Sequence, residues 1–432
     1  PPQWPWLQPA AAAAARRATP FVLRGRRCSS SVSTSFCASA PSGHAREQVT
    51  TEDEQSLVVV GGGAAGVYAS IRAKTLAPHL NVVVIEKGKF LSKVKISGGG
   101  RCNVTNGHQL DPSGLARNYP RGYKELRGSF FRTHGPQDTM HWFSDHGVEL
   151  KAGKSVSGAS VNDNGKFLVE VQKRTVDFVD YIDANYVLVA TGSSQQGYSF
   201  AAQHGHSIIP PVPSLFTFKI ADKRLADLSG VSFTRVTAKL MLDGIQKSAP
   251  ELTQTGPMLV THWGLSGPVV LRLSAWGARE LYQDKYQAKL VVDFIPDIHI
   301  EDVKRILFQH KDQHASLDGD MHWATVPKSH LNAIALRLKQ WMFEVVGKGQ
   351  FKDEFVTAGG VPLSEISLST MESKKQPNLF FAGEVLNVDG VTGGFNFQNA
   401  WTGGHIAGTS IGTLASNSIL KEEQACLQLQ GS

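Results

Sequence analysis

A glycine-rich turn at residues 61–66 constrains the fold of this 432-residue chain more than any other feature. The turn reads Gly-Gly-Gly-Ala-Ala-Gly and follows the apolar run Leu57–Val60, which has the β-branched character of a buried parallel strand. From Ala64 to about Ala77, small and apolar side chains recur at helical spacing. The sequence therefore predicts a strand, a tight turn and a helix, which is the setting in which a G-x-G-x-x-G pattern binds a dinucleotide.

Each glycine of this pattern has a predicted role. Gly61 permits the tight turn, Gly63 lets the backbone approach a pyrophosphate, and Gly66 lets the helix pack closely on the strand. The helix that begins with Ala64 and Ala65 would direct its unpaired N–H groups at the phosphates.

A second apolar run, Asn81–Ile85, ends at an acid, Glu86, which lies 20 residues after Gly66. In dinucleotide-binding units an acid at this place accepts hydrogen bonds from a ribose. We therefore predict a dinucleotide site at the C-terminal ends of these two strands. A glycine turn without a ligand is the alternative.

The stretch that follows, Ile96–Asn106, reads Ile-Ser-Gly-Gly-Gly-Arg-Cys-Asn-Val-Thr-Asn. Three consecutive glycines let a backbone lie against a flat or anionic ligand. We predict a loop that forms a second wall of the site, and the alternative is a surface loop. Cys102 is a candidate catalytic thiol beside a redox cofactor, although a lone cysteine is more often packed and inert.

Two later segments suit the same site. The predicted strand Tyr186–Ala190 ends in Ala-Thr-Gly, which puts small residues where the chain passes a cofactor. The apolar strand Leu379–Ala382 ends in Gly383 and Glu384, and a helix is predicted to begin near Gly394. The acid would accept hydrogen bonds from the hydroxyls of a sugar alcohol, and the helix N-terminus would stabilise a ring that becomes anionic. This pairing favours a flavin over a nicotinamide alone.

The first 46 residues contain no Asp or Glu, six arginines and a serine-rich run. This composition is typical of an organelle transit peptide, with a plastid favoured over a mitochondrion, and a disordered tail is the alternative. The whole chain carries 44 Lys and Arg against 37 Asp and Glu, a net charge of +7. Without the six arginines the balance is +1, so charge predicts neither a nucleic-acid nor a membrane partner. The four cysteines form no C-x-x-C pair, and we expect no metal site.

We predict five segments: a transit peptide at 1–50, a first cofactor domain part at 51–213, an inserted domain at 214–350, a second cofactor domain part at 351–416, and a tail at 417–432. Short strands are expected at 216–220, 236–242 and 289–294 of the insertion, and 301–347 reads as largely helical, with Trp341 on a buried stripe. His262, next to Trp263, is a candidate substrate-pocket residue and otherwise part of a packed aromatic corner.

Five motifs together resemble the BaiN-like flavoproteins, a family also described as aminoacetone-oxidase-like or NAD(P)/FAD-dependent oxidoreductases. They are the glycine turn, Ile96–Asn106, Thr261–Pro268, Val356–Val361 and Phe381–Gly394. The resemblance runs from about Val58 to about Ala415 and points to a plant-type organellar member. It implies an α/β fold, with a glutathione-reductase-like Rossmann FAD domain interrupted by a β-barrel-like and helical insertion.

The resemblance also implies which residues contact FAD. They are Gly61, Gly63, Ala64, Ala65, Gly66, Glu86, Lys87, Ser97, Gly98, Gly99, Gly100, Arg101, Cys102, Asn103, Thr105, Asn106, Val156, Ala190, Thr191, Gly192, Gly383, Glu384, Asp389, Gly393, Gly394, Asn396, Phe397 and Gln398. The chain departs from the family pattern by being short after Lys151, after Gly192 and near Ala315.

The function expected from these features is that of an FAD-dependent oxidoreductase acting on a small molecule. FAD carries the hydride chemistry, and oxygen, another acceptor or NAD(P)H completes the cycle. No second complete G-x-G-x-x-G is present, so NAD(P)H would dock only transiently. A flavin-free NAD-binding dehydrogenase and a non-catalytic or RNA-modifying flavoprotein are the alternatives, and the oligomeric state is open.

Overall fold

The glycine turn joins a strand of a six-stranded sheet to the helix that follows it. Strand β1 (Ser56–Val60) leads into helix α1 (Ala64–Leu76), and β2 (Asn81–Ile85) lies parallel to β1. The computed structural model describes residues 55–100, 103–152, 157–160, 184–242, 250–313, 326–349 and 356–430. The strand–turn–helix unit predicted from the sequence is therefore confirmed.

The sheet has the order β14-β15-β16-β5-β1-β2. Strands β5 (Tyr186–Val189) and β16 (Leu379–Phe381) continue the parallel core, although nearly 200 residues separate them along the chain. Two short antiparallel strands, β14 (Ile366–Ser367) and β15 (Glu372–Ser373), complete one edge. Parallel strands carry their C-terminal ends to one edge of a sheet, so the predicted cofactor segments meet there.

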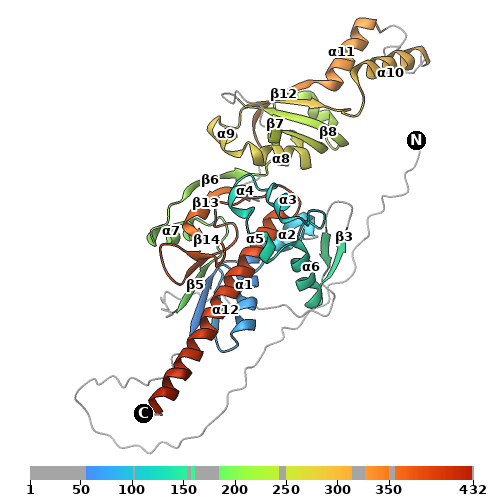
Figure 1. Ribbon diagram of the computed structural model, residues 1–432. Helices are drawn as coiled ribbons and strands as arrows, with labels where there is room; N and C mark the ends of the chain where they lie inside the picture. Colours follow the sequence, from blue (N-terminus) through green and yellow to red (C-terminus); the bar gives the residue numbers. More distant parts are fainter. Residues whose placement is uncertain are drawn as a thin grey trace, which may run out of the picture. The chain divides into compact units, whose positions relative to one another are not determined.

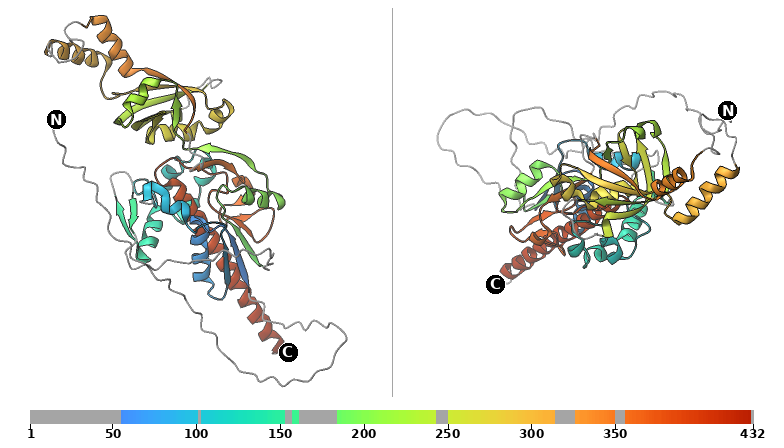
Figure 2. Two further views of the ribbon diagram at one scale, coloured as in Figure 1. Left: turned by 180° about the vertical axis from the view of Figure 1, so that it is seen from behind. Right: turned by 90° about the horizontal axis from the view of Figure 1, so that it is seen from above.

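A long C-terminal helix, α12 (Phe395–Gln430), packs along α1 (Figure 1), and Figure 2 shows the same pair from behind. Small residues permit this close approach. A Cβ on Gly404 would lie 2.7 Å from the Ala65 carbonyl oxygen, and one on Gly408 would lie 2.5 Å from that of Ala69. The buried core of this part combines these helices with apolar side chains of the parallel strands.

Several short elements connect β2 to β5. They are α2 (Ser92–Gly100), α3 (Pro112–Ala116), α4 (Tyr123–Leu126), α5 (Phe130–Thr133), α6 (Pro136–Asp145), β3 (Glu149–Ala152) and β4 (Ser157–Ser160). The prediction of a loop before Asn103 was wrong, because α2 continues through the three glycines. Helix α7 (Gln195–Gln203) follows β5.

The second body is a closed six-stranded barrel of order β10-β7-β12-β11-β8-β9, whose strands come from residues 218–348. They are β7 (Phe218–Ile220), β8 (Ser232–Met241), β9 (Thr253–Thr261), β10 (Gly264–Ser266), β11 (Ala288–Asp293) and β12 (Trp341–Lys348). Helices α8 (Pro268–Trp276), α9 (Ala278–Gln283), α10 (Ile300–Gln313) and α11 (Lys328–Lys339) accompany it. The chain passes between the two bodies through a ribbon of β6 (Ile209–Ser214) and β13 (Val356–Gly360). This is the α/β Rossmann fold with a barrel-like and helical part that the sequence predicts.

One element of the barrel was predicted wrongly. Helix α11 ends at Lys339, and Trp341 begins strand β12 instead of continuing a helical stripe. Within β12, Phe343 and Val345 are buried while Met342 is exposed, which is the two-residue alternation of a strand. No helix in the described part of the chain has the length and apolar character needed to cross a membrane.

Candidate functional site

The glycines of the turn between β1 and α1 differ in whether the surrounding structure leaves room for a side chain. Gly61 has φ +112°, and a Cβ there would overlap the Ala190 carbonyl, so packing alone requires glycine. Gly66 is equally constrained, because a Cβ would overlap the carbonyl of Gly61. Gly63 has an ordinary extended conformation, and a Cβ there would meet no atom within 4 Å. Space is therefore left in front of Gly63.

The N-terminus of α1 opens at this space. Its N-cap residue, Gly63, provides no side-chain hydrogen bond, and the first turn contains no acid. The leading N–H groups of a helix need acceptors, and a phosphate can supply them.

Glu86 is held rigidly at the end of β2. One carboxylate oxygen accepts a hydrogen bond from the Gly62 N–H and the other from the Gly88 N–H, both at 2.7 Å. Each oxygen retains lone pairs for further donors. The acid is thus oriented for ribose hydroxyls, as the spacing predicts.

These groups line one cavity of about 1240 Å³, which is large compared with the ~300–1,000 Å³ of common ligand sites. Of the residues predicted to contact the cofactor, the cavity is lined by Gly61, Gly63, Ala64, Ala65, Glu86, Ser97, Asn103, Ala190, Thr191, Gly192, Gly383, Glu384, Gly393, Gly394, Asn396 and Phe397. Helix α12 begins at Phe395, so a second helix N-terminus reaches the same cavity.

Four predicted contact residues lie behind the wall and support it instead. Gln398 is fully buried, accepts a hydrogen bond from Thr105 and donates to Thr139 and Thr402. Asn106 donates to the Gly393 carbonyl at 3.0 Å. Because their polar groups are used within the protein, Thr105, Asn106 and Gln398 hold the loop before α12 in place.

Asp389 is the fourth, and it does not line the cavity. Its side chain is fully buried, forms a bidentate ion pair with Arg121 and accepts a hydrogen bond from Ser214 at 2.8 Å. Arg121 also donates to the carbonyl of Ala275 at 2.8 Å, at the end of α8. The pair therefore joins the cofactor domain to the barrel.

The remaining predicted residues fall elsewhere. Gly66 allows α1 to pack closely against Gly61 and Val59. Lys87 is exposed, and Gly98, Gly99 and Gly100 form the end of α2. Arg101, Cys102 and Val156 lie outside the described residues.

His262 is exposed in the turn between β9 and β10 and is not among the residues that line the cavity. Its neighbour Trp263 is 42% exposed, so the two rings do not form a packed aromatic corner.

Sequence reasoning missed Lys93 of α2, which also lines the cavity. Its ammonium lies 3.1 Å from Oε2 of Glu384, while Oε1 of Glu384 accepts the Thr357 N–H at 2.9 Å. Burial raises the pKa of Glu384, and Lys93 opposes this shift. The spacing of Lys93 and Ser97, four residues apart, was the available signal for one helical face.

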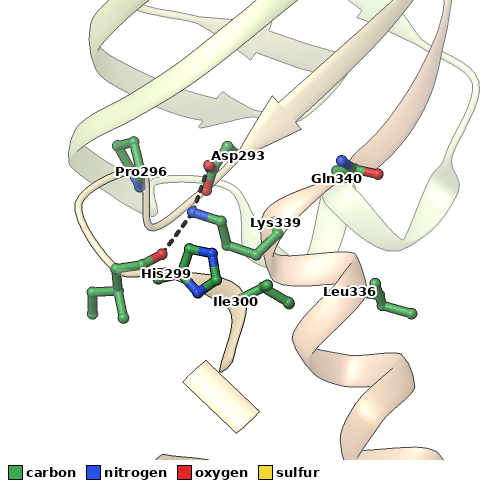
Figure 3. A pocket seen from close by; sticks show the side chains of 8 residues that line it. Asp293, Pro296, His299, Ile300, Leu336, Lys339 and Gln340 are labelled. Atoms are coloured by element: carbon green, nitrogen blue, oxygen red, sulfur yellow. Dashed lines mark hydrogen bonds and ion pairs between the residues drawn. The ribbon is translucent and has the colours of Figure 1, made fainter. Parts of the chain in front are cut away.

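A second hollow, of about 500 Å³, lies between the barrel and its helices (Figure 3). Lys339 is its central polar group, and its ammonium contacts Asp293 at 2.7 Å and the carbonyls of Ile295 and Ile298 at 3.0 and 2.8 Å. All three donors of this lysine are therefore occupied, and the hollow offers no comparable anion site.

The family model described as "HI0933-like protein Rossmann domain" matches residues 55–157 and 148–410. The chain belongs to this family. The members of this family are FAD-dependent oxidoreductases, and the family assignment therefore supports FAD as the cofactor.

Among curated proteins, a 3-dehydro-bile acid delta(4,6)-reductase of Clostridium scindens is 28% identical, over 80% of this chain and 96% of that protein. A ribosomal RNA dihydrouridine synthase of Haemophilus influenzae is 27% identical, over 81% and 96%. A solved structure of Escherichia coli quinol fumarate reductase FrdA has a TM-score of 0.40 and 13% identity, over 87% of this chain and 74% of that one. The first alignment spans 404 positions, whereas 80% of this chain is about 346 residues, so about 58 positions have no counterpart here.

The residues present fit FAD. The cavity has an uncapped helix N-terminus with open space at Gly63 for a pyrophosphate and an oriented carboxylate, Glu86, for the adenosine ribose. It also has a second carboxylate, Glu384, and the N-terminus of α12. A mononucleotide would leave part of this set unused.

Proposed function

We propose that this protein is an FAD-dependent reductase of a carbon–carbon double bond conjugated with a carbonyl group in a small molecule, with NAD(P)H as the source of electrons. The observation that carries the proposal is the convergence of two helix N-termini and two carboxylates on one cavity. When bound, FAD supplies hydride transfer at its flavin ring.

The protein's own groups bind and orient this cofactor. The N–H groups at the start of α1 bind the pyrophosphate, and Glu86 accepts hydrogen bonds from the ribose. Glu384 accepts hydrogen bonds from the ribityl chain. The N-terminus of α12, with its partial positive charge, stabilises negative charge on the flavin ring, which favours the reduced cofactor.

The names of the relatives support the direction and the type of bond. A 3-dehydro-bile acid delta(4,6)-reductase acts, by its name, on double bonds of a 3-oxo compound. A dihydrouridine synthase reduces a ring double bond of uridine that is also conjugated with a carbonyl. The shared chemistry is delivery of hydride to an electron-poor carbon and of a proton to its neighbour.

Uridine within RNA is the second candidate substrate, and it is favoured by two relatives named ribosomal RNA dihydrouridine synthase. The net charge of about +1 beyond residue 46 argues against it, because phosphate contacts need clustered Lys and Arg.

The test begins with a visible spectrum of the purified chain, in which bound FAD would give two flavin bands. Anaerobic NADPH or NADH should bleach these bands, and 2-cyclohexen-1-one should restore them with formation of cyclohexanone. A folded protein without flavin, or bleached flavin that no conjugated ketone reoxidises, contradicts the proposal. Turnover of ribosomal RNA but not of the ketone would select the second candidate.

A further inference from the structure

The ion pair between Lys93 and Glu384 joins α2 to the loop after β16 at the wall of the cavity. The two residues are 291 positions apart in the sequence, and both line the cavity. The Lys93 side chain is 55% exposed and that of Glu384 is 19% exposed. A pair with such an exposed lysine contributes little to folding stability, so stability alone does not account for it.

The two partners are held very differently. Glu384 is fixed from its other side by the Thr357 N–H at 2.9 Å, on the ribbon that leads from the barrel. Lys93 has three N–H donors, and the bond to Glu384 at 3.1 Å uses one of them. Within the part of the chain that the structure describes, two donors of this cation therefore remain at the cavity wall.

The other charges on the wall show which ligand group these donors suit. Glu86 and Glu384 are the acids that line the cavity in the described part of the chain, and Lys89 and Lys93 are the cations. FAD brings a doubly charged pyrophosphate into this balanced set. The N-terminus of α1 offers it a partial positive charge, and a full charge is needed to complete the neutralisation.

We propose that Lys93 is a positioning residue that contacts the FAD pyrophosphate while its bond to Glu384 keeps that carboxylate directed at the ribityl hydroxyls. The inference rests on the proposed function only for the identity of the cofactor. One lysine thereby links the phosphate end of the cofactor to the sugar-alcohol end. The pair makes the cavity selective for a flavin that carries a pyrophosphate.

The experiment measures binding, without turnover, on full-length protein freed of flavin. FAD, ADP and riboflavin are titrated by calorimetry, because ADP contains the pyrophosphate without the ribityl chain and riboflavin the reverse. Lys93→Gln should lower the affinities for FAD and ADP by about tenfold to a hundredfold, which is the range expected for loss of a charged hydrogen bond. The affinity for riboflavin should change less than threefold, and Lys93→Arg should retain most of the wild-type affinity for FAD.

Lys95→Gln is the matched control, because Lys95 is exposed on the same helix and is not among the residues that line the cavity. It should leave all three affinities within twofold. Glu384→Gln should lower the affinities for FAD and riboflavin but not the affinity for ADP. Thermal unfolding without ligand should be the same for Lys93→Gln and wild type, which separates binding from folding.

Two results would overturn the role of Lys93. One is wild-type FAD and ADP affinity in Lys93→Gln, and the other is a loss confined to riboflavin and FAD, which would make Lys93 a support for Glu384 only. Wild-type protein that binds no FAD would instead contradict the proposed cofactor itself.

Discussion

Gly61 and Gly63 are two residues apart, and alanine at the two positions should have different effects. At Gly61 the backbone has φ +112°, and the new Cβ would overlap the Ala190 carbonyl. Left-handed strain and overpacking together should destabilise Gly61→Ala by ~2–4 kcal/mol. At Gly63 the conformation, φ −83° and ψ −166°, is ordinary for alanine, and no atom lies within 4 Å of the new Cβ. Gly63→Ala should therefore change the stability of the flavin-free protein by less than ~1 kcal/mol, because the lower freedom of the unfolded chain is offset by the poorer fit of alanine at an N-cap.

The effect of Gly63→Ala on cofactor binding should be larger than its effect on stability. The methyl group of Gly63→Ala would occupy the space through which the pyrophosphate approaches α1, so FAD should bind ~10–100 times more weakly. Urea unfolding of flavin-free protein gives the first quantity, and flavin fluorescence titration gives the second. Unchanged FAD affinity in a stable Gly63→Ala protein would refute our placement of the pyrophosphate at this turn.

Three further predictions concern the support of the site. Burial holds the pKa of His134 at about 3, below its usual 6.5, so the unfolded chain binds this proton more tightly. Stability should therefore fall by up to ~1.4 kcal/mol per pH unit as the pH drops from 6.5 toward 3, and pH-dependent urea unfolding should show a shallower fall in His134→Gln. Arg121→Met should cost ~3–5 kcal/mol by urea unfolding, because it leaves the buried carboxylate of Asp389 without its cation, and a loss below 1 kcal/mol would contradict the buried pair. Gly408→Ala should destabilise the protein by ~1–3 kcal/mol in the same assay, because the new Cβ would clash with the Ala69 carbonyl of α1. Gly403→Ala should cost far less, because the nearest atom to its new Cβ lies at 3.5 Å.

The sequence predicts the elements whose chemistry is local. The strand, turn and helix at residues 57–77 follow from an apolar run, a glycine-rich turn and a helical pattern that are contiguous in the sequence, and the start of α12 after Gly394 follows in the same way. The meeting of β5 and β16 with β1 could also be anticipated, since parallel strands with small residues at their ends share one edge of a sheet.

Other features depend on distances that spacing does not encode. Asp389 and Glu384 are both acids in one loop, yet Asp389 meets Arg121 behind the wall while Glu384 faces the cavity. Helix α2 was missed because three glycines have poor helix propensity, and tertiary contacts override such preferences. Strand β12 was missed because Trp341 extends the apolar spacing of α11, although the alternation after it has a period of two.

The segments that this chain lacks relative to its relatives should affect the cofactor site less than their combined length suggests. The two family matches overlap at residues 148–157, near β3, and β2 is the last strand of the described sheet. No residue of β2 is fully buried there, so that edge is thinly covered. Yet Glu86, which follows β2, is oriented from the inner side by the Gly62 N–H of the central turn. Glu384 and the N-termini of α1 and α12 lie away from this edge, and we expect a thin sheet edge to lower stability before it lowers the affinity for the cofactor.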